Sequence, residues 1–201
     1  MPFPGRLYLL FTPSLCKGDP WTTLSGAISG GVDLVQWRSK ESDPSGYLRC
    51  RDLCRRRGVP LLVNDDVMLA VRSRAHGAHV GQGDLPAEAA RKLLFDQALG
   101  ISTHDPKQIV DAAAAGADYV GFGPCFPTAT KGYEHGKSSE EIEAAVLQAA
   151  AVGVPLFAVG GITPERLLPL RTLGVDHVAV SSAILGAEDP RAAAQALRRL
   201  L

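Results

Sequence analysis

The chain has 201 residues, of which 46% are hydrophobic and 21% charged, and this apolar content suits one compact domain and excludes a disordered protein. Lysine and arginine number 21, and so do aspartate and glutamate, so the net charge is zero and no long-range field attracts nucleic acid or an anionic membrane. Because no apolar run reaches the roughly 20 residues that cross a bilayer, and the first residues lack the order of a signal peptide, we expect a cytoplasmic protein.

Eight short apolar runs recur along the chain, and each is followed by a stretch of helical composition. The runs do not alternate with polar residues, which is typical of parallel strands buried on both faces. In chain order, the predicted strands are Leu7–Phe11, Asp33–Trp37, Pro60–Val63, Gly77–Val80, Ala98–Ile101, Asp118–Phe122, Pro155–Val159 and Asp176–Val180. The predicted helices are Trp21–Ser29, Ser45–Arg57, Asp66–Ser73, Ala87–Phe95, Lys107–Ala115, Ser139–Ala151, Glu165–Thr172 and Arg191–Leu201.

Residues that favour helix ends mark these boundaries. Four residues that can cap a helix stand directly before a proline, namely Asp43, Asp105, Thr163 and Asp189. Ser138 with Glu141 predicts a capping box. Glycines that we expect to end helices with a positive φ open four similar segments, Gly31–Asp33, Gly77–His79, Gly116–Asp118 and Gly174–Asp176.

Eight strand–helix units in 201 residues give about 25 residues each, near the lower limit for a closed (β/α)8 barrel. We predict this TIM barrel as a single α/β domain over residues 1–201. A doubly wound open sheet is the alternative, but it would normally carry a glycine-rich turn after the first strand, and Thr12–Leu15 is not one. The longest gap between elements, residues 124–137, has the length of a functional lid.

Small residues after the last two strands predict a phosphate site, because the active face of such a barrel lies at the carboxyl ends of its strands. Gly160 and Gly161 let backbone N–H groups approach an anion closely, and Ser181 and Ser182 add hydroxyl and amide donors. The alternative is that the glycines only make a tight turn and that Ser182 caps a helix.

Charged side chains follow other strands at the same predicted rim. Asp65 and Asp84 come after the third and fourth strands, and carboxylates that face a phosphorylated ligand suit Mg²⁺. Three cations, Arg38, Lys40 and Lys131, would neutralise the remaining phosphate charge. The alternative for the two aspartates is helix capping, and for Lys131 a solvated loop position.

The histidines and cysteines carry weaker signals. His79 lies within a strand, which favours a packed interior residue, whereas His104 follows the fifth strand and contacts either a substrate or only its neighbours. The four scattered cysteines are expected to be free thiols. The chain has neither a histidine pair at metal-binding helical spacing nor a G-x-S-x-G motif, which argues against zinc and serine hydrolases.

Six segments together resemble the thiamine phosphate synthase family. They are Val35–Lys40, Val63–Asp65, His79–Pro86, Gly100–His104, Gly121–Lys131 and Val159–Ile162, in the same order and at compatible spacing. The segment that ends at Lys131 is unusual outside this family and its sister, the TenI-type thiazole tautomerases.

This resemblance implies a Mg²⁺-dependent transferase that joins hydroxymethylpyrimidine diphosphate to a thiazole phosphate and releases pyrophosphate. By similarity, Asp65 and Asp84 hold Mg²⁺, Ser102 faces the pyrimidine diphosphate and Gln36 lies near its ring. The residues implied for pyrophosphate are Arg38, Lys40, Asn64 and Lys131, and those implied for the thiazole phosphate are Thr128, Thr130, Gly161 and Ser182. The resemblance makes Arg38, Lys40, Ser102 and Lys131 the expected catalytic residues.

The chain also departs from the family pattern. Pro13 follows Thr12 where the family usually has aspartate, and residues 132–136 replace the usual loop. In the tautomerases a catalytic histidine follows the sixth strand, where this chain has Pro124, and this favours the synthase. Two alternatives stay open: a tautomerase that needs no metal, and a barrel that binds phosphorylated metabolites without turnover. Self-association and the thiazole form used are also left open.

Overall fold

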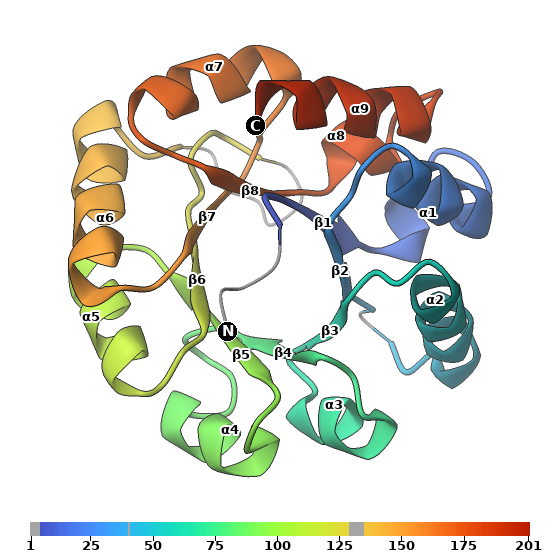
Figure 1. Ribbon diagram of the computed structural model, residues 1–201, viewed down its shortest axis with the longest axis horizontal. Coiled ribbons are helices and arrows are strands. Elements are labelled where there is room, and N and C mark those ends of the chain that lie inside the picture. Colours follow the sequence, from blue (N-terminus) through green and yellow to red (C-terminus); the bar gives the residue numbers. More distant parts are fainter. Residues whose placement is uncertain (1–4, 40, 129–134) are drawn as a thin grey trace.

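The computed structural model describes residues 5–39, 41–128 and 135–201, and over these ranges eight parallel strands close into a barrel (Figure 1). Each strand pairs with its neighbours in the sequence, and β8 pairs with β1. The predicted (β/α)8 barrel is therefore confirmed. The open doubly wound sheet is excluded, because every strand in the described part of the chain is paired on both sides and the sheet there has no edge strand.

Every predicted element has a counterpart whose bounds differ by no more than two residues. The strands are β1 (Leu7–Phe11), β2 (Leu34–Trp37), β3 (Leu61–Asn64), β4 (Gly77–Val80), β5 (Ala98–Thr103), β6 (Tyr119–Phe122), β7 (Leu156–Val159) and β8 (His177–Val180). The helices are α1 (Pro20–Ser29), α2 (Pro44–Arg56), α3 (Val67–Ser73), α4 (Ala87–Leu94), α5 (Pro106–Ala114), α6 (Ser139–Val152), α7 (Pro164–Thr172), α8 (Ser182–Leu185) and α9 (Pro190–Leu200). The short α8 was not predicted. Within the described ranges, all helices are too short or too polar to cross a bilayer.

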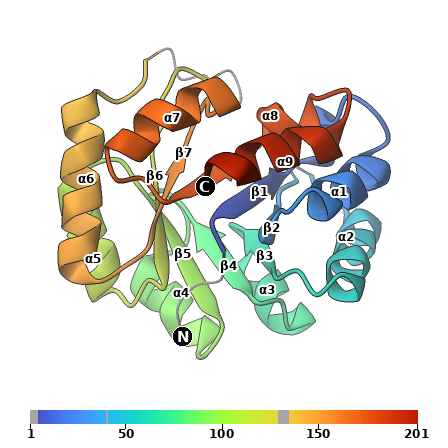
Figure 2. The same cartoon turned by 45° about the horizontal axis from the view of Figure 1, so that its top comes forward.

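Side chains pack in two layers. Helices surround the barrel (Figure 2), and the larger core is formed by side chains from the strands and from these helices. A smaller cluster fills the barrel interior and consists of Tyr8, Leu10, Leu34, Leu62, Tyr119, Phe157 and Ala179. Because side chains alternate along a strand, β1 sends Leu7 and Leu9 to the outer core and Tyr8 to the interior.

Most of the predicted helix caps are present. The carboxylates of Asp43, Asp105 and Asp189 accept backbone N–H groups at the starts of α2, α5 and α9. The capping box at the start of α6 is confirmed. The cap predicted for Thr163 is wrong, because its side chain makes no capping hydrogen bond, although proline still opens α7. Asp19 caps α1 in the same way as the other aspartates, and this cap was not predicted.

The glycine-led segments are alike in three of the four places. Gly31, Gly116 and Gly174 have φ values of +105°, +84° and +84°, in the left-handed region that favours glycine. The expectation for Gly77 is wrong, because it lies inside β4, where a Cβ would come within 2.0 Å of the carbonyl oxygen of Ala98. This glycine is needed for the close approach of β5, and Arg74 supplies the left-handed residue at the end of α3.

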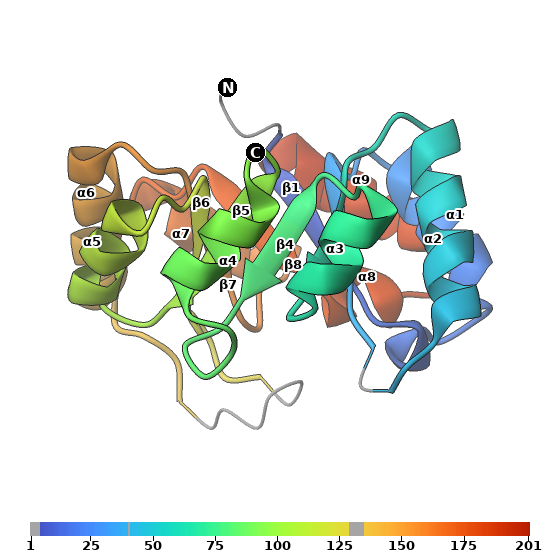
Figure 3. The same cartoon turned by 90° about the horizontal axis from the view of Figure 1, so that it is seen from below.

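An aspartate after two of these glycines braces the amino end of a neighbouring strand. Oδ2 of Asp33 accepts the backbone N–H groups of Arg6 at 2.6 Å and Leu7 at 2.9 Å, and it also accepts from the guanidinium of Arg198 at 2.8 Å. Oδ2 of Asp118 accepts the N–H of Leu99, the second residue of β5, at 2.8 Å. Both aspartates directly precede a strand, so they lie at the end of the barrel at which the strands begin; Figure 3 shows the barrel from the side.

We expect Asp33→Ala to lower the free energy of unfolding by about 1–3 kcal/mol, because two backbone N–H groups would lose their acceptor. Urea denaturation would measure the change. Asp52→Ala is the matched control: Asp52 is exposed on α2, pairs only with the adjacent Arg51 and should alter stability by less than about 0.5 kcal/mol. Equal losses in the two variants would contradict the bracing role of Asp33.

Candidate functional site

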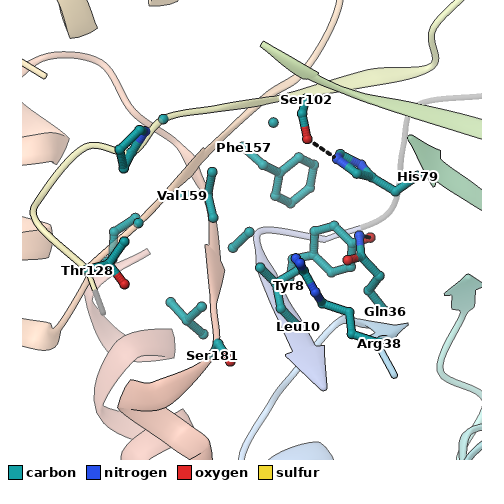
Figure 4. A pocket seen from close by; sticks show the side chains of 18 of the residues that line it. Tyr8, Leu10, Gln36, Arg38, His79, Ser102, Thr128, Phe157, Val159 and Ser181 are labelled. Carbon is teal, nitrogen blue, oxygen red and sulfur yellow. Dashed lines mark hydrogen bonds between the residues drawn. The ribbon is translucent and has the colours of Figure 1, made fainter. Parts of the chain in front are cut away.

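A pocket opens at the carboxyl ends of the strands, and its deepest walls are side chains of the interior cluster (Figure 4). Tyr8 and Phe157 line its apolar part. Around them, Arg38, Ser102 and Ser181 come from segments that follow or end different strands. The barrel therefore concentrates polar groups from distant parts of the sequence around one cavity, as its architecture predicts.

The structure places most of the predicted site residues around this pocket. Its walls include Gln36, Arg38, Ser102, Thr128, Gly160, Gly161, Ser181 and Ser182. The remaining described residues of the predicted site, Asn64, Asp65 and Asp84, lie at the ends of the neighbouring strands β3 and β4. Lys40, Thr130 and Lys131 lie outside the described residues.

Arg38 connects the pocket to the two aspartates. Burial of its guanidinium lowers its pKa, while the negative charges of Asp65 and Asp84 oppose this shift. The guanidinium of Arg38 therefore lies within electrostatic reach of both carboxylates.

Neither aspartate caps a helix, so that alternative is wrong for both. Asp66 is the N-cap of α3, where its carboxylate accepts the N–H of Leu69 at 2.8 Å. The N-cap position of α4 is Pro86. The carboxylates of Asp65 and Asp84 are therefore not committed to starting the helices that follow them.

Backbone geometry fixes the place of each aspartate. Asp65 has a φ of +64°, which is uncommon for a residue other than glycine, and its N–H donates to the carbonyl of His79 at 2.8 Å. Oδ2 of Asp84 accepts the N–H of Gly81 at 2.6 Å. This bond leaves the other carboxylate oxygen of Asp84, together with further lone pairs, to other ligands.

These two carboxylates fit a magnesium ion that is bound partly by a ligand. Among the described residues, no group of three or more histidine, cysteine, aspartate or glutamate side chains could hold a metal alone. Mg²⁺ is commonly bound by one or two carboxylates, with water and substrate phosphates completing its six oxygen ligands. The donor set of Asp65 and Asp84 suits that arrangement better than a closed protein cage.

The glycine pair after β7 has a left-handed backbone at both positions. Gly160 and Gly161 have φ values of +101° and +61°. A Cβ on Gly160 would come within 2.7 Å of Cα of Pro124, and one on Gly161 within 2.6 Å of the carbonyl oxygen of Pro127. The pair is therefore needed to bring the loop after β6 against the end of β7.

Serine completes this side of the pocket. The hydroxyl of Ser181 is buried and has no hydrogen-bond partner among the described residues. Ser182 is the first residue of α8. An unpaired buried hydroxyl that lines a pocket is a candidate ligand contact, because leaving it unsatisfied lowers stability.

The two histidines behave differently. His79 is buried, as predicted, and its ring bonds Tyr119 and Ser102. Nδ1 of His104 donates to the carbonyl of Gly123 at 2.6 Å, and the ring also lines the pocket. His104 therefore contacts a neighbouring residue, and its ring also faces the cavity in which a substrate would lie.

Tyr8 and Tyr119 are pocket residues that sequence reasoning missed. Both appear in the sequence only as strand residues, yet their hydroxyls meet inside the barrel and connect Gln36 to His79. The available signal was a tyrosine within an otherwise apolar strand, together with Gly100, where a Cβ would lie 2.1 Å from Cζ of Tyr119.

Comparisons with known proteins identify the family. A family model described as thiamine monophosphate synthase matches residues 7–184. A thiamine-phosphate synthase of Bacillus velezensis is 38% identical over 94% of this chain and 87% of its own length. One of Chloroflexus aurantiacus is also 38% identical, over 98% of this chain and 92% of its own length.

A solved structure gives the same result. The thiamine phosphate pyrophosphorylase of Pyrococcus furiosus superposes with a TM-score of 0.85 at 29% identity, covering 97% of this chain and 94% of that one. A 3-hexulose-6-phosphate synthase, with a TM-score of 0.72 and 16% identity, shares the fold. The chain belongs to the thiamine monophosphate synthase family.

We expect Gly160→Ala to weaken binding of a phosphorylated ligand at least about ten-fold and to lower the free energy of unfolding by about 2 kcal/mol or more, because it adds a clash to the backbone strain. Gly153→Ala is the matched control. Gly153 has a φ of +75° at the end of α6, and a Cβ there would meet no atom within 4 Å. It should lose stability through strain alone and leave ligand binding unchanged. Calorimetric titration and urea denaturation would measure both effects, and equal ligand binding in the two variants would contradict the assignment.

Proposed function

We propose that this family member is a thiamine phosphate synthase, which transfers the hydroxymethylpyrimidine group from its diphosphate to a thiazole phosphate and releases pyrophosphate. The observation that carries the proposal is the grouping of Arg38, Asp65 and Asp84 beside a pocket whose far wall is the Gly160–Gly161 turn. A cationic and acidic rim suits a diphosphate with its metal, and the turn suits a phosphate monoester.

In this reaction the bond between the pyrimidine methylene carbon and the diphosphate oxygen breaks before or while a new carbon–nitrogen bond forms. The electrons of the carbon–oxygen bond leave with pyrophosphate, and the lone pair of the thiazole nitrogen attacks the pyrimidine methylene carbon. No protein nucleophile is needed. The protein's part is to hold the two substrates in line and to stabilise the departing charge.

Arg38 is the described cation placed for that stabilisation. Its guanidinium lines the pocket and can donate several hydrogen bonds to phosphate oxygens in a fixed planar arrangement. Asn64, at the end of β3, adds an amide donor. Lys40 and Lys131 complete the proposed pyrophosphate site.

Asp65 and Asp84 would hold Mg²⁺, which when bound neutralises charge on the diphosphate. The backbone prepares both side chains for this role. The N–H of Gly81 keeps the carboxylate of Asp84 in place, and the left-handed backbone at Asp65 fixes where that side chain leaves the strand. Both carboxylates also act on Arg38 and so help to hold a guanidinium that is largely removed from water.

The pocket divides between the two substrates. The pyrimidine half is assigned to Gln36 and Ser102, which lie on the β2 and β5 side of the barrel. The thiazole phosphate is assigned to the opposite wall, formed by Thr128, Gly160, Gly161, Ser181 and Ser182. Thr130, which lies outside the described residues, is assigned to the same phosphate by its place in the sequence. The proposal places the protein in the cytoplasm, where its four free thiols would stay reduced.

The proposal is tested by supplying both phosphorylated substrates and measuring pyrophosphate release with Mg²⁺ and with a chelator. We expect release that requires both substrates and the metal. Failure to release pyrophosphate under any metal would refute the synthase. Aromatisation of a thiazole phosphate tautomer without metal would instead identify the isomerase, and tight binding without product would identify a binding barrel.

We expect Asp84→Asn to lower kcat by about 100-fold or more, because the variant keeps an acceptor for Gly81 but loses the charge that binds the metal. Asp66→Asn is the matched control at the same rim, since asparagine caps a helix as well as aspartate does. It should retain activity. Comparable kcat values for Asp84→Asn and the unmodified protein would contradict the metal assignment.

A further inference from the structure

Four hydrogen bonds form a chain across the barrel interior. Nε2 of Gln36 donates to the hydroxyl of Tyr8 at 2.7 Å, and the hydroxyls of Tyr8 and Tyr119 lie 2.9 Å apart. The Tyr119 hydroxyl lies 2.9 Å from Nδ1 of His79, and Nε2 of His79 lies 2.9 Å from the hydroxyl oxygen of Ser102. The members come from five strands, and Gln36 and Ser102 at its ends both line the pocket.

The middle of this hydrogen-bond chain is buried. Tyr8 and Tyr119 are at most 1% exposed, and His79 is 8% exposed. Burial raises the pKa of both phenols well above the ordinary value, so each hydroxyl keeps its single proton. A hydroxyl with one proton can donate only one hydrogen bond, so donors and acceptors can be assigned one after another along the hydrogen-bond chain.

Starting from Gln36, a single order gives both phenol protons an acceptor within these hydrogen bonds. The amide nitrogen donates to Tyr8, the Tyr8 proton goes to Tyr119, and the Tyr119 proton goes to Nδ1 of His79. His79 then accepts at Nδ1 and carries its own proton on Nε2, which donates to Ser102. The hydroxyl proton of Ser102 is therefore not used within the chain.

Other contacts show that the surrounding structure is shaped for this chain. A Cβ on Gly100 would lie 2.1 Å from the Tyr119 ring, and one on Gly121 would lie 3.3 Å from Cε1 of His79. Nε2 of Gln82 donates to the carbonyl of Ser102 at 2.6 Å, which holds the backbone that carries the last hydroxyl. Glycines thus leave space for the rings, and Gln82 holds Ser102, the last member of the hydrogen-bond chain, in place.

We propose that Tyr119, with Tyr8 behind it, is a positioning residue that acts through His79 to make Ser102 a hydrogen-bond donor to the pyrimidine diphosphate. The consequence for the substrate rests on the proposed function, whereas the state of His79 does not. Tyr119 fixes the tautomer of the imidazole. The Nε2–H group of the imidazole then donates to one lone pair of the Ser102 hydroxyl oxygen, and the Ser102 proton is directed to a ligand acceptor. No proton is transferred in this arrangement.

The first test is the tautomer of His79 in the unmodified protein without ligands, measured by long-range ¹H–¹⁵N correlation and assigned by the loss of its signals in His79→Gln. We expect a proton on Nε2 and none on Nδ1. In Tyr119→Phe, we expect the Nδ1-protonated form to appear alongside it, because the donor to Nδ1 is gone. Tyr47→Phe is the control, since it removes a buried hydroxyl that bonds Ser73 outside the barrel interior, and it should leave His79 unchanged.

The second test is kinetic. Tyr119→Phe should raise KM for the pyrimidine diphosphate or lower kcat/KM about ten-fold, which is the contribution of roughly one hydrogen bond. KM for the thiazole phosphate should not change. Because Tyr119 acts through Ser102, the same substitution made in Ser102→Ala should have no further effect.

Three results would overturn the proposal: an Nδ1-protonated His79 in the unmodified protein, an unchanged tautomer in Tyr119→Phe, or additive losses in the double variant. The first of these needs no variant, so the test holds even if Tyr119→Phe does not fold. A protein without synthase activity would refute the proposed function, and the tautomer measurement would still decide the role of Tyr119.

Discussion

Closure of the sheet by the pairing of β8 with β1 is the constraint on which the rest of the structure depends. The register Tyr8↔Ala179 joins the first strand to the last, and it leaves the described part of the barrel without an open edge. Once the ring is closed, residues just beyond each short strand must meet around one opening. Arg38 follows β2 and Ser181 follows β8, and they are far apart in the sequence, yet they line one pocket because of this closure.

The same closure creates an interior too narrow for anything except side chains, so polar atoms there must satisfy one another. Tyr8, Tyr119 and His79 do so by bonding to one another. The rings of Tyr8 and Tyr119 also contact the ring of Phe157 edge to face. Tyrosine is suited to this place because one end of it packs as an apolar ring and the other end bonds. The apolar packing of the barrel and the polar wall of the pocket are therefore parts of one structure.

Much of the fold could be predicted from the sequence because its signals are local. Continuous apolar runs located the strands, and aspartate before proline located helix starts at Asp43, Asp105 and Asp189. The same local pattern failed at Thr163, whose hydroxyl makes no cap, and at Gly77, where contact with β5 decides the residue. Local patterns do not report such long-range contacts.

The site divides in the same way. Residues that follow strands, such as Asp65 and Ser181, could be predicted because chain order alone places them at the rim. The hydrogen-bonded interior could not, because both faces of the strands are mostly apolar and buried, so the sequence shows neither which alternate side chains face inward nor the register in which the strands pair. Gly100 opposite Tyr119 is evidence of that register, but it becomes readable only when β5 and β6 are aligned.

Asp33 also has a consequence for how the chain folds. Its carboxylate connects the start of β1 to Arg198, which is 165 residues from Asp33 in the sequence. Arg6 also donates to the carbonyl of Leu201. A topology with such long sequence separations has a high contact order and folds slowly, since loop entropy is lost before the contact forms. On the ribosome, β1 emerges first and waits for β8 to be synthesised, so its unpaired side is a site at which a nascent chain needs protection.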